Sequence, residues 1–143
     1  MRPSIEERMN RQIEKSRTYN GMFDAAVAAV ETATSASAVQ VADNQFSVTS
    51  NTLTTYITCS DNDYATINVD IDYQAGTGNM QRVADLNVNI NGAYEENYHS
   101  IPRAIRSAVF DIVNDVIDAV CGFLDDQNYT DAVDTTANNQ KNK

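Results

Sequence analysis

The chain has 143 residues, enough for one domain with a hydrophobic core, and no stretch of it suggests a second domain. Its formal net charge of −10 and sequence pI of about 4.3 exclude a general affinity for nucleic acid. The sequence contains neither a recognisable secretory signal nor an apolar stretch long enough to span a membrane, so we expect a cytoplasmic protein.

The charges are distributed unevenly along the chain. Half of the basic residues lie in the first seventeen positions, and two lysines are found at the end of the chain. Between residues 18 and 140, the only cations are Arg82, Arg103 and Arg106, and the remaining charged residues there are acidic. This acidic excess is explained either by solubility alone or by recognition of a basic partner.

The N-terminal region predicts two helices. Residues 4–19 carry an apolar side chain at every fourth position, together with most of the basic residues. Asn20 and Gly21 form a pair that commonly breaks or kinks a helix. The alanine-rich residues 22–36 predict a second helix, whose small side chains would let another helix approach closely. We expect this segment to cover the second of two apolar stripes on the helix predicted for residues 101–124.

The middle of the chain predicts an antiparallel sheet. Its clearest strand runs from Tyr64 to Tyr73, where apolar residues alternate with polar ones, which indicates one buried and one wet face. This strand and the next one should pair as a hairpin. Residues 93–100 are expected to be a connecting loop. The five strands are expected at residues 38–41, 46–50, 53–59, 64–73 and 82–91.

The wet face of this hairpin carries asparagine and aspartate. Asp70 and Asp72 point the same way and are close enough to share a hard cation. Polar outer faces are ordinary, however, and the spacing of a calcium-binding loop is absent, so we expect no metal site.

Residues 101–124 predict one long helix with an unusually wide apolar surface. Its apolar residues cover roughly half of the circumference, whereas the stripe of an ordinary surface helix covers about 100°. A sheet could cover one stripe, and the second needs another helix, either from the same chain or from a second copy. The first stripe contains Ile105, Val109, Ile112, Val116, Ala119 and Phe123, and the second contains Phe110, Val113, Ile117 and Leu124.

The start of this helix contains a candidate anion site. Ser100 is a plausible N-cap, and Arg103 and Arg106 lie one turn apart close to the positive end of the helix dipole. The two arginines either pair with nearby acids such as Glu95 and Glu96 or lie solvated, or else they bind a phosphate- or nucleotide-like anion. Neighbouring aromatic residues could stack on a planar ligand. The candidate ligand-binding residues are Tyr94, Tyr98, His99, Ser100, Arg103 and Arg106.

No catalytic constellation is recognisable in the sequence. His99 is the only histidine, and no serine lies in a nucleophile-elbow motif. Cys59 and Cys121 fall in apolar patterns that are typical of buried free thiols. We therefore expect neither a cofactor nor an enzyme, although a phosphoester-acting enzyme that uses His99 remains one alternative.

The predicted fold is α+β, with N-terminal helices, an antiparallel sheet of about five strands in meander order, and a long C-terminal helix packed on one sheet face. The opposite face of the sheet should stay open. The chain divides into a basic helical arm over residues 1–20, a single α+β domain over residues 21–126 and a polar tail over residues 127–143.

The predicted function is that of a small, acidic, non-enzymatic binding or inhibitor protein. One version of this prediction is a viral protein of the phage type, which would act in the host cytoplasm. It would associate with itself through its helices and capture an anionic ligand or a basic host protein. An assembly protein of a virion or of another large complex is the alternative. The expected interface residues are Phe110, Val113, Ile117 and Leu124, with Arg8, Arg11 and Lys15 of the basic arm set against the ridge of Asp111, Asp115 and Asp118 on the partner copy.

Overall fold

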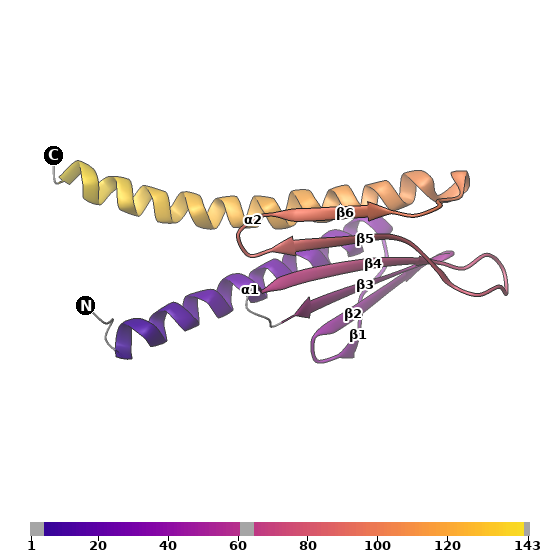
Figure 1. Cartoon of the computed structure of the whole chain (residues 1–143), viewed down its shortest axis with the longest axis horizontal. Helices are drawn as coiled ribbons and strands as arrows, with labels where there is room; N and C mark the ends of the chain where they lie inside the picture. Colours follow the sequence, from indigo (N-terminus) through magenta and orange to yellow (C-terminus); the bar gives the residue numbers. More distant parts are fainter. Residues whose placement is uncertain (1–4, 61–64, 142–143) are drawn as a thin grey trace.

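Two long antiparallel helices lie on one face of a six-stranded sheet (Figure 1). The computed structural model describes residues 5–60 and 65–141, with side chains except those of residues 8, 10–16 and 127–141. The elements are α1 (Ile5–Thr34), β1 (Val39–Ala42), β2 (Gln45–Ser50), β3 (Leu53–Ser60), β4 (Thr66–Tyr73), β5 (Gln81–Asn89), β6 (Tyr94–Tyr98), the 3-10 turn η1 (Arg103–Ile105) and α2 (Arg106–Lys141).

The sheet is an antiparallel meander in the order β1 to β6, which confirms the predicted α+β class and the β4–β5 hairpin. It contains one strand more than expected. Residues 93–100 are not only a loop, because Tyr94–Tyr98 pairs along β5 as an edge strand. The sequence YEENY does not alternate because all five of its residues are exposed at the sheet edge. The sequence of this strand therefore lacks the alternation of apolar and polar residues that indicates a half-buried strand.

The prediction that Asn20 and Gly21 separate two helices was wrong, because α1 continues through both residues as one helix. Glycine inside a helix costs about 1 kcal/mol relative to alanine. The structure shows what Gly21 permits instead: a Cβ at this position would overlap the ring of Phe123 in α2. Gly21 therefore lets the two helices approach each other at this point, and this tertiary contact outweighs its low helix propensity.

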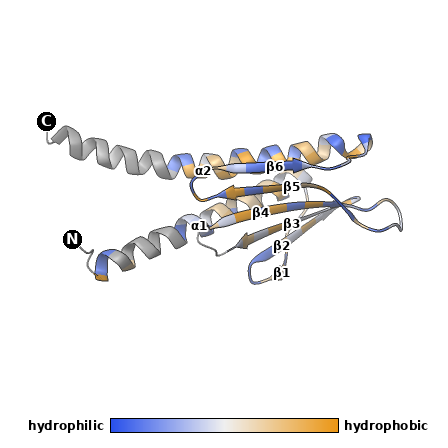
Figure 2. Ribbon diagram, in the orientation of Figure 1, coloured by the Kyte–Doolittle hydropathy of each residue, from blue (hydrophilic) through white to orange (hydrophobic). Residues whose placement is uncertain are grey.

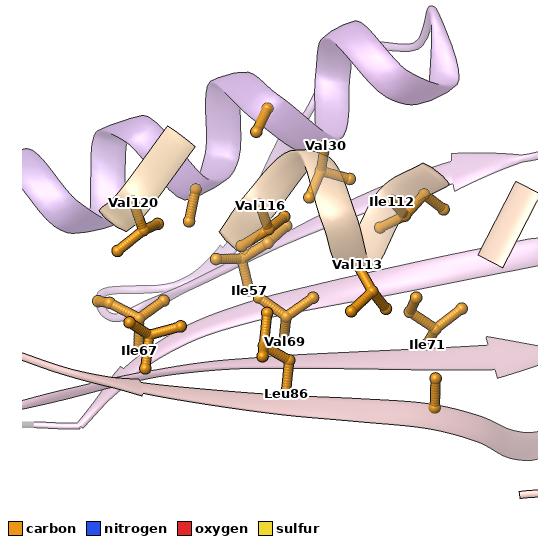
Figure 3. Packing of buried hydrophobic residues seen from close by; sticks show 14 of the residues in the cluster. Val30, Ile57, Ile67, Val69, Ile71, Leu86, Ile112, Val113, Val116 and Val120 are labelled. Atoms are coloured by element: carbon orange, nitrogen blue, oxygen red, sulfur yellow. The ribbon is translucent and has the colours of Figure 1, made fainter. Parts of the chain in front are cut away.

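Most of both apolar stripes of α2 is covered within the chain, and Phe110 is the most exposed of their large side chains. The first stripe faces α1, since Phe123 lies on Gly21 and Ala119 lines a groove with alanines of α1. The second stripe turns toward the sheet, where Phe110 packs edge-on against Tyr98 of β6 at 5.0 Å. Val116 of the first stripe also points toward the strands in Figure 3, so the sheet and α1 share the coverage of the two stripes, and coverage of the second stripe by α1 stays a prediction.

The core lies between the helices and the inner face of the sheet. It contains the inward residues of β3, β4 and β5 together with buried residues of both helices (Figure 3). In the part of α2 that lies over the sheet, apolar residues recur between hydrophilic ones, as Figure 2 shows. Most of the alternation predicted for β4 and β5 is confirmed, and Ile67, Val69, Ile71, Leu86 and Val88 are buried.

The helices run across the predicted domain boundaries. α1 crosses the boundary at residues 20 and 21, and α2 crosses that at residues 126 and 127 and ends at Lys141. The division into an arm, a domain and a tail therefore stays a prediction. None of the helices in the described part of the chain is long and apolar enough to cross a membrane.

Candidate functional site

The open face of the sheet carries a charged network centred on Arg82. A β-bulge places this arginine there: Ile71 pairs with Ala84 and Asp72 pairs with Arg82, so Val83 is an extra residue in β5. In an uninterrupted strand, Arg82 would point to the same side as Ala84, toward the core. Because the bulge reverses this direction, the Arg82 guanidinium lies on the open face, where it contacts both Asp70 and Asp72.

A second part of the network connects β5 with β6. The Asn97 Nδ2 donates to Asp85 Oδ1 at 2.9 Å, and the His99 Nε2 lies 3.1 Å from Asp85 Oδ2. Asp85 is also paired directly with Asp70 across the β4–β5 ladder, where like charges repel. Arg82 and the side chains of Asn97 and His99 therefore offset a repulsion that the strand register creates.

The two carboxyl groups respond differently to this environment. Burial raises the pKa of Asp70, the charge of Arg82 opposes the rise, and Asp85 and Asp72 reinforce it. At Asp85, burial is outweighed by the hydrogen bonds from Asn97 and His99, so the pKa is lowered. Asp70 and Asp72 thus face an internal cation. No set of three His, Cys, Asp or Glu side chains arranged to hold a metal occurs among the described residues.

Arg82→Gln is expected to raise the pKa of Asp70 further, because it removes the positive charge that opposes the rise and leaves Asp72 and Asp85 in place. The pKa of this carboxyl group is higher in the folded state than its unfolded value of 3.8. The protein therefore loses stability as the pH rises from 3.8 to the folded pKa. The variant should widen this interval. Carbon-detected NMR titration of Asp70 measures the change, and Arg103→Gln, which leaves the network intact, should not alter it.

The predicted anion site is only partly assembled. The proposed N-cap Ser100 was wrong, because the turn η1 is preceded by Pro102 and lacks a side-chain cap. Arg103 and Arg106 are both exposed and form no ion pair with a described residue, which agrees with the expectation that they lie solvated rather than paired with acids in that part of the chain. They do not line the 410 Å³ cleft that Ala104 and Ile105 help to form.

The aromatic candidates lie apart from one another. Tyr98 packs on Phe110, and its hydroxyl donates to Glu96 at 2.7 Å, while burial and this carboxylate raise its pKa. His99 instead contacts Asp85 on the open face. Tyr94 begins the strand that Tyr98 ends, which separates them by about 13 Å. The six ligand-binding candidates are thus not gathered into one pocket, and anion binding by the arginines stays a prediction.

The predicted interface residues differ in how much they are exposed. Phe110 is 36% exposed and Ile117 is partly buried, whereas Val113 and Leu124 are buried by this chain. A second copy of the chain could therefore contact this stripe mainly through Phe110. The side chains of Arg8, Arg11 and Lys15 lie outside the described residues, so their interface role also stays a prediction.

A groove of about 630 Å³ lies between the two helices on their outer side. Its α1 side is shallow because the residues there are small, and its α2 side carries carboxylates. Asp115 and Asp118 line it directly, and Asp111 continues their row along α2. All three are exposed, and none forms an ion pair with a described residue. The lining residues are Ala25, Ala28, Ala29, Thr32, Asp115, Asp118 and Ala119.

The sequence contained both halves of this groove without showing that they meet. The alanine run of residues 22–36 predicts a surface for helix packing, and Asp111, Asp115 and Asp118 lie on the polar side of the helix predicted for residues 101–124. They come together only because α1 lies antiparallel beside α2 (Figure 1). No protein-family model matches the chain, and no curated protein or solved structure shows a significant match to it.

Proposed function

We propose that this chain is a non-enzymatic, acidic binding protein that holds a basic amphipathic helix of another protein in the groove between α1 and α2. The observation that carries this proposal is the joining of an alanine floor to an aspartate ridge in one groove of about 630 Å³. The floor offers apolar surface to one face of a helix, and the ridge offers carboxylates to basic residues beside that face.

The composition of the groove favours a helix over other occupants. Ala25, Ala28 and Ala29 leave room for larger apolar side chains from a partner, as in recognition of an amphipathic helix by a groove. A ridge of aspartates repels anionic ligands, so a phosphate group or a nucleic acid is disfavoured there. The surplus of acids between residues 18 and 140 extends the attraction beyond the groove and should accelerate encounter with a basic partner.

Removal of the ridge should weaken binding selectively. We expect the triple variant Asp111→Asn, Asp115→Asn and Asp118→Asn to bind a synthetic Lys/Leu amphipathic helix roughly tenfold more weakly or worse, since each exposed charge pair contributes about 0.2–1 kcal/mol. Isothermal titration at low salt measures the dissociation constant. A scrambled peptide of the same composition, which cannot form an apolar stripe, should bind far more weakly to the unmodified protein.

The matched control removes the same number of charges elsewhere, at Asp43, Glu95 and Glu96, which are exposed and lie outside the groove. Equal weakening by both triple variants would mean that the peptide responds only to net charge, and the groove would then have no special role. Residues 1–17 of a second copy, which carry more basic than acidic residues, are the competing occupant. Sedimentation at micromolar concentration and low salt identifies that case by a dimer that the ridge variant abolishes.

A further inference from the structure

We propose that the cleft on the open face of β4, β5 and β6 binds a neutral polyhydroxylated ligand, namely a saccharide. This cleft has a volume of about 460 Å³ and lies on the other side of the sheet from the helix groove. It is lined by Thr66 and Asn68 of β4, Asn87 and Asn89 of β5, Ala93 of the following turn, and Tyr94 and Glu95 of β6.

The register of the strands brings the carboxamides of the cleft together. Asn68 pairs with Asn87 across the β4–β5 ladder, and Asn87 pairs with Glu95 across the β5–β6 ladder. Thr66 and Asn89 form the neighbouring pair. Directly paired residues have Cβ atoms about 5 Å apart, so these side chains form a compact polar patch.

Existing hydrogen bonds orient part of this patch and leave the rest unused. Thr66 Oγ1 donates to Asn89 Oδ1 at 3.0 Å, so the amide nitrogen of Asn89 remains a donor. Asn68 Nδ2 donates to Ser60 Oγ at 2.9 Å, so the carbonyl of Asn68 remains an acceptor. Asn87 makes no side-chain hydrogen bond with a described residue, and thus offers both a donor and an acceptor between the other two.

This alternation of donors and acceptors matches the hydroxyl groups of a sugar, each of which donates one hydrogen bond and accepts others. Tyr94 lines the edge of the cleft, but its pairing with the buried Val88 directs its ring to the helix side of β6, so the amides and not an aromatic ring would hold the sugar. The lining contains a carboxylate, Glu95, and no cation, which disfavours an anionic ligand. These properties together select a neutral polyol over a nucleotide or a phosphosugar.

The test is an NMR titration of the full chain with glucose, galactose, mannose and N-acetylglucosamine and with their disaccharides. We expect one or more of these sugars to shift the side-chain amide signals of Asn68, Asn87 and Asn89 saturably, and to leave that of Gln74, which lies outside the cleft, unchanged. Asn87→Ala should weaken this binding about tenfold. Gln45→Ala removes a carboxamide from the same sheet face outside the cleft and should have no effect.

Asn87→Asp keeps the side-chain shape, so it tests the loss of the donor even if the alanine variant is unstable. It should weaken sugar binding as well. The proposal is overturned if no sugar produces a saturable shift, if both Asn87 variants bind as tightly as the unmodified protein, or if adenosine, added in parallel, shifts the same amides while the sugars do not. None of these outcomes bears on the groove between α1 and α2, because the aspartate variant and the peptide probe that test it involve no residue of this cleft.

Discussion

Val113→Asp should unfold the protein or bring it close to unfolding at neutral pH. Val113 is 1% exposed and points from α2 toward the strands (Figure 3). An ionised carboxylate there would have no partner, and an uncompensated buried charge costs of order 3–5 kcal/mol. The total stability of a domain is typically about 5–15 kcal/mol. Urea unfolding followed by circular dichroism measures the loss, which should shrink as pH falls and the new carboxyl group becomes neutral.

Phe110→Asp is the matched control for that variant, because it introduces the same residue one turn earlier in the same stripe. Phe110 is 36% exposed, so the new carboxylate would remain in water. The loss should be confined to the buried part of the ring and to its edge contact with Tyr98, which contributes about 0.5–1.5 kcal/mol. Equal losses of stability in the two variants would show that the stripe is not covered by the sheet as described.

The second large effect is expected at Gly21. Gly21→Val should lower the free energy of unfolding by about 1–3 kcal/mol, because the added side chain must displace the ring of Phe123 or push the helices apart. The higher helix propensity of valine offsets only part of this loss. Thermal and urea unfolding measure it, and the additional change Phe123→Ala should relieve the overlap, so that valine costs less in that background.

Gly122→Ala provides a control of opposite sign. Gly122 lies in α2 directly before Phe123, and a Cβ added there would meet nothing within 4 Å. Alanine should therefore raise the free energy of unfolding by about 0.5–1 kcal/mol through its helix propensity alone. A stabilising Gly21→Val or a destabilising Gly122→Ala would contradict the contact between α1 and α2 that the structure describes.

The sequence was most informative where one face of a strand is buried and the other is wet. The alternation in β4 and β5 predicted both strands, their hairpin and their buried faces correctly, because the period of two reports burial directly. β6 was missed for the same reason: a short edge strand with all residues exposed shows no alternation. The wide apolar surface of α2 likewise predicted that two different elements pack against it. Periodicity alone could not say which part of this surface lies against α1.

The candidate sites were harder to predict because each depends on a contact distant in sequence. Arg82 lies on the open face only because Val83 forms a bulge, and no local pattern marks that bulge. The helix groove needs α1 beside α2, and the carboxamide cleft needs β6, which was expected to be a loop. The arginine pair was conspicuous in the sequence because cations are scarce there, yet Arg103 and Arg106 are not brought into a cleft with the aromatic residues.

The packing of α1 on α2 of the same chain is the contact on which the helix groove depends. It is tested most directly by an isotope-filtered NOE experiment on a mixture of labelled and unlabelled chains. The structure predicts a strong NOE within one chain between the Gly21 Hα protons and the ring protons of Phe123, with the Gly21 signals displaced by the ring current. An NOE found only between chains, or none at all, would mean that a single chain does not form the groove.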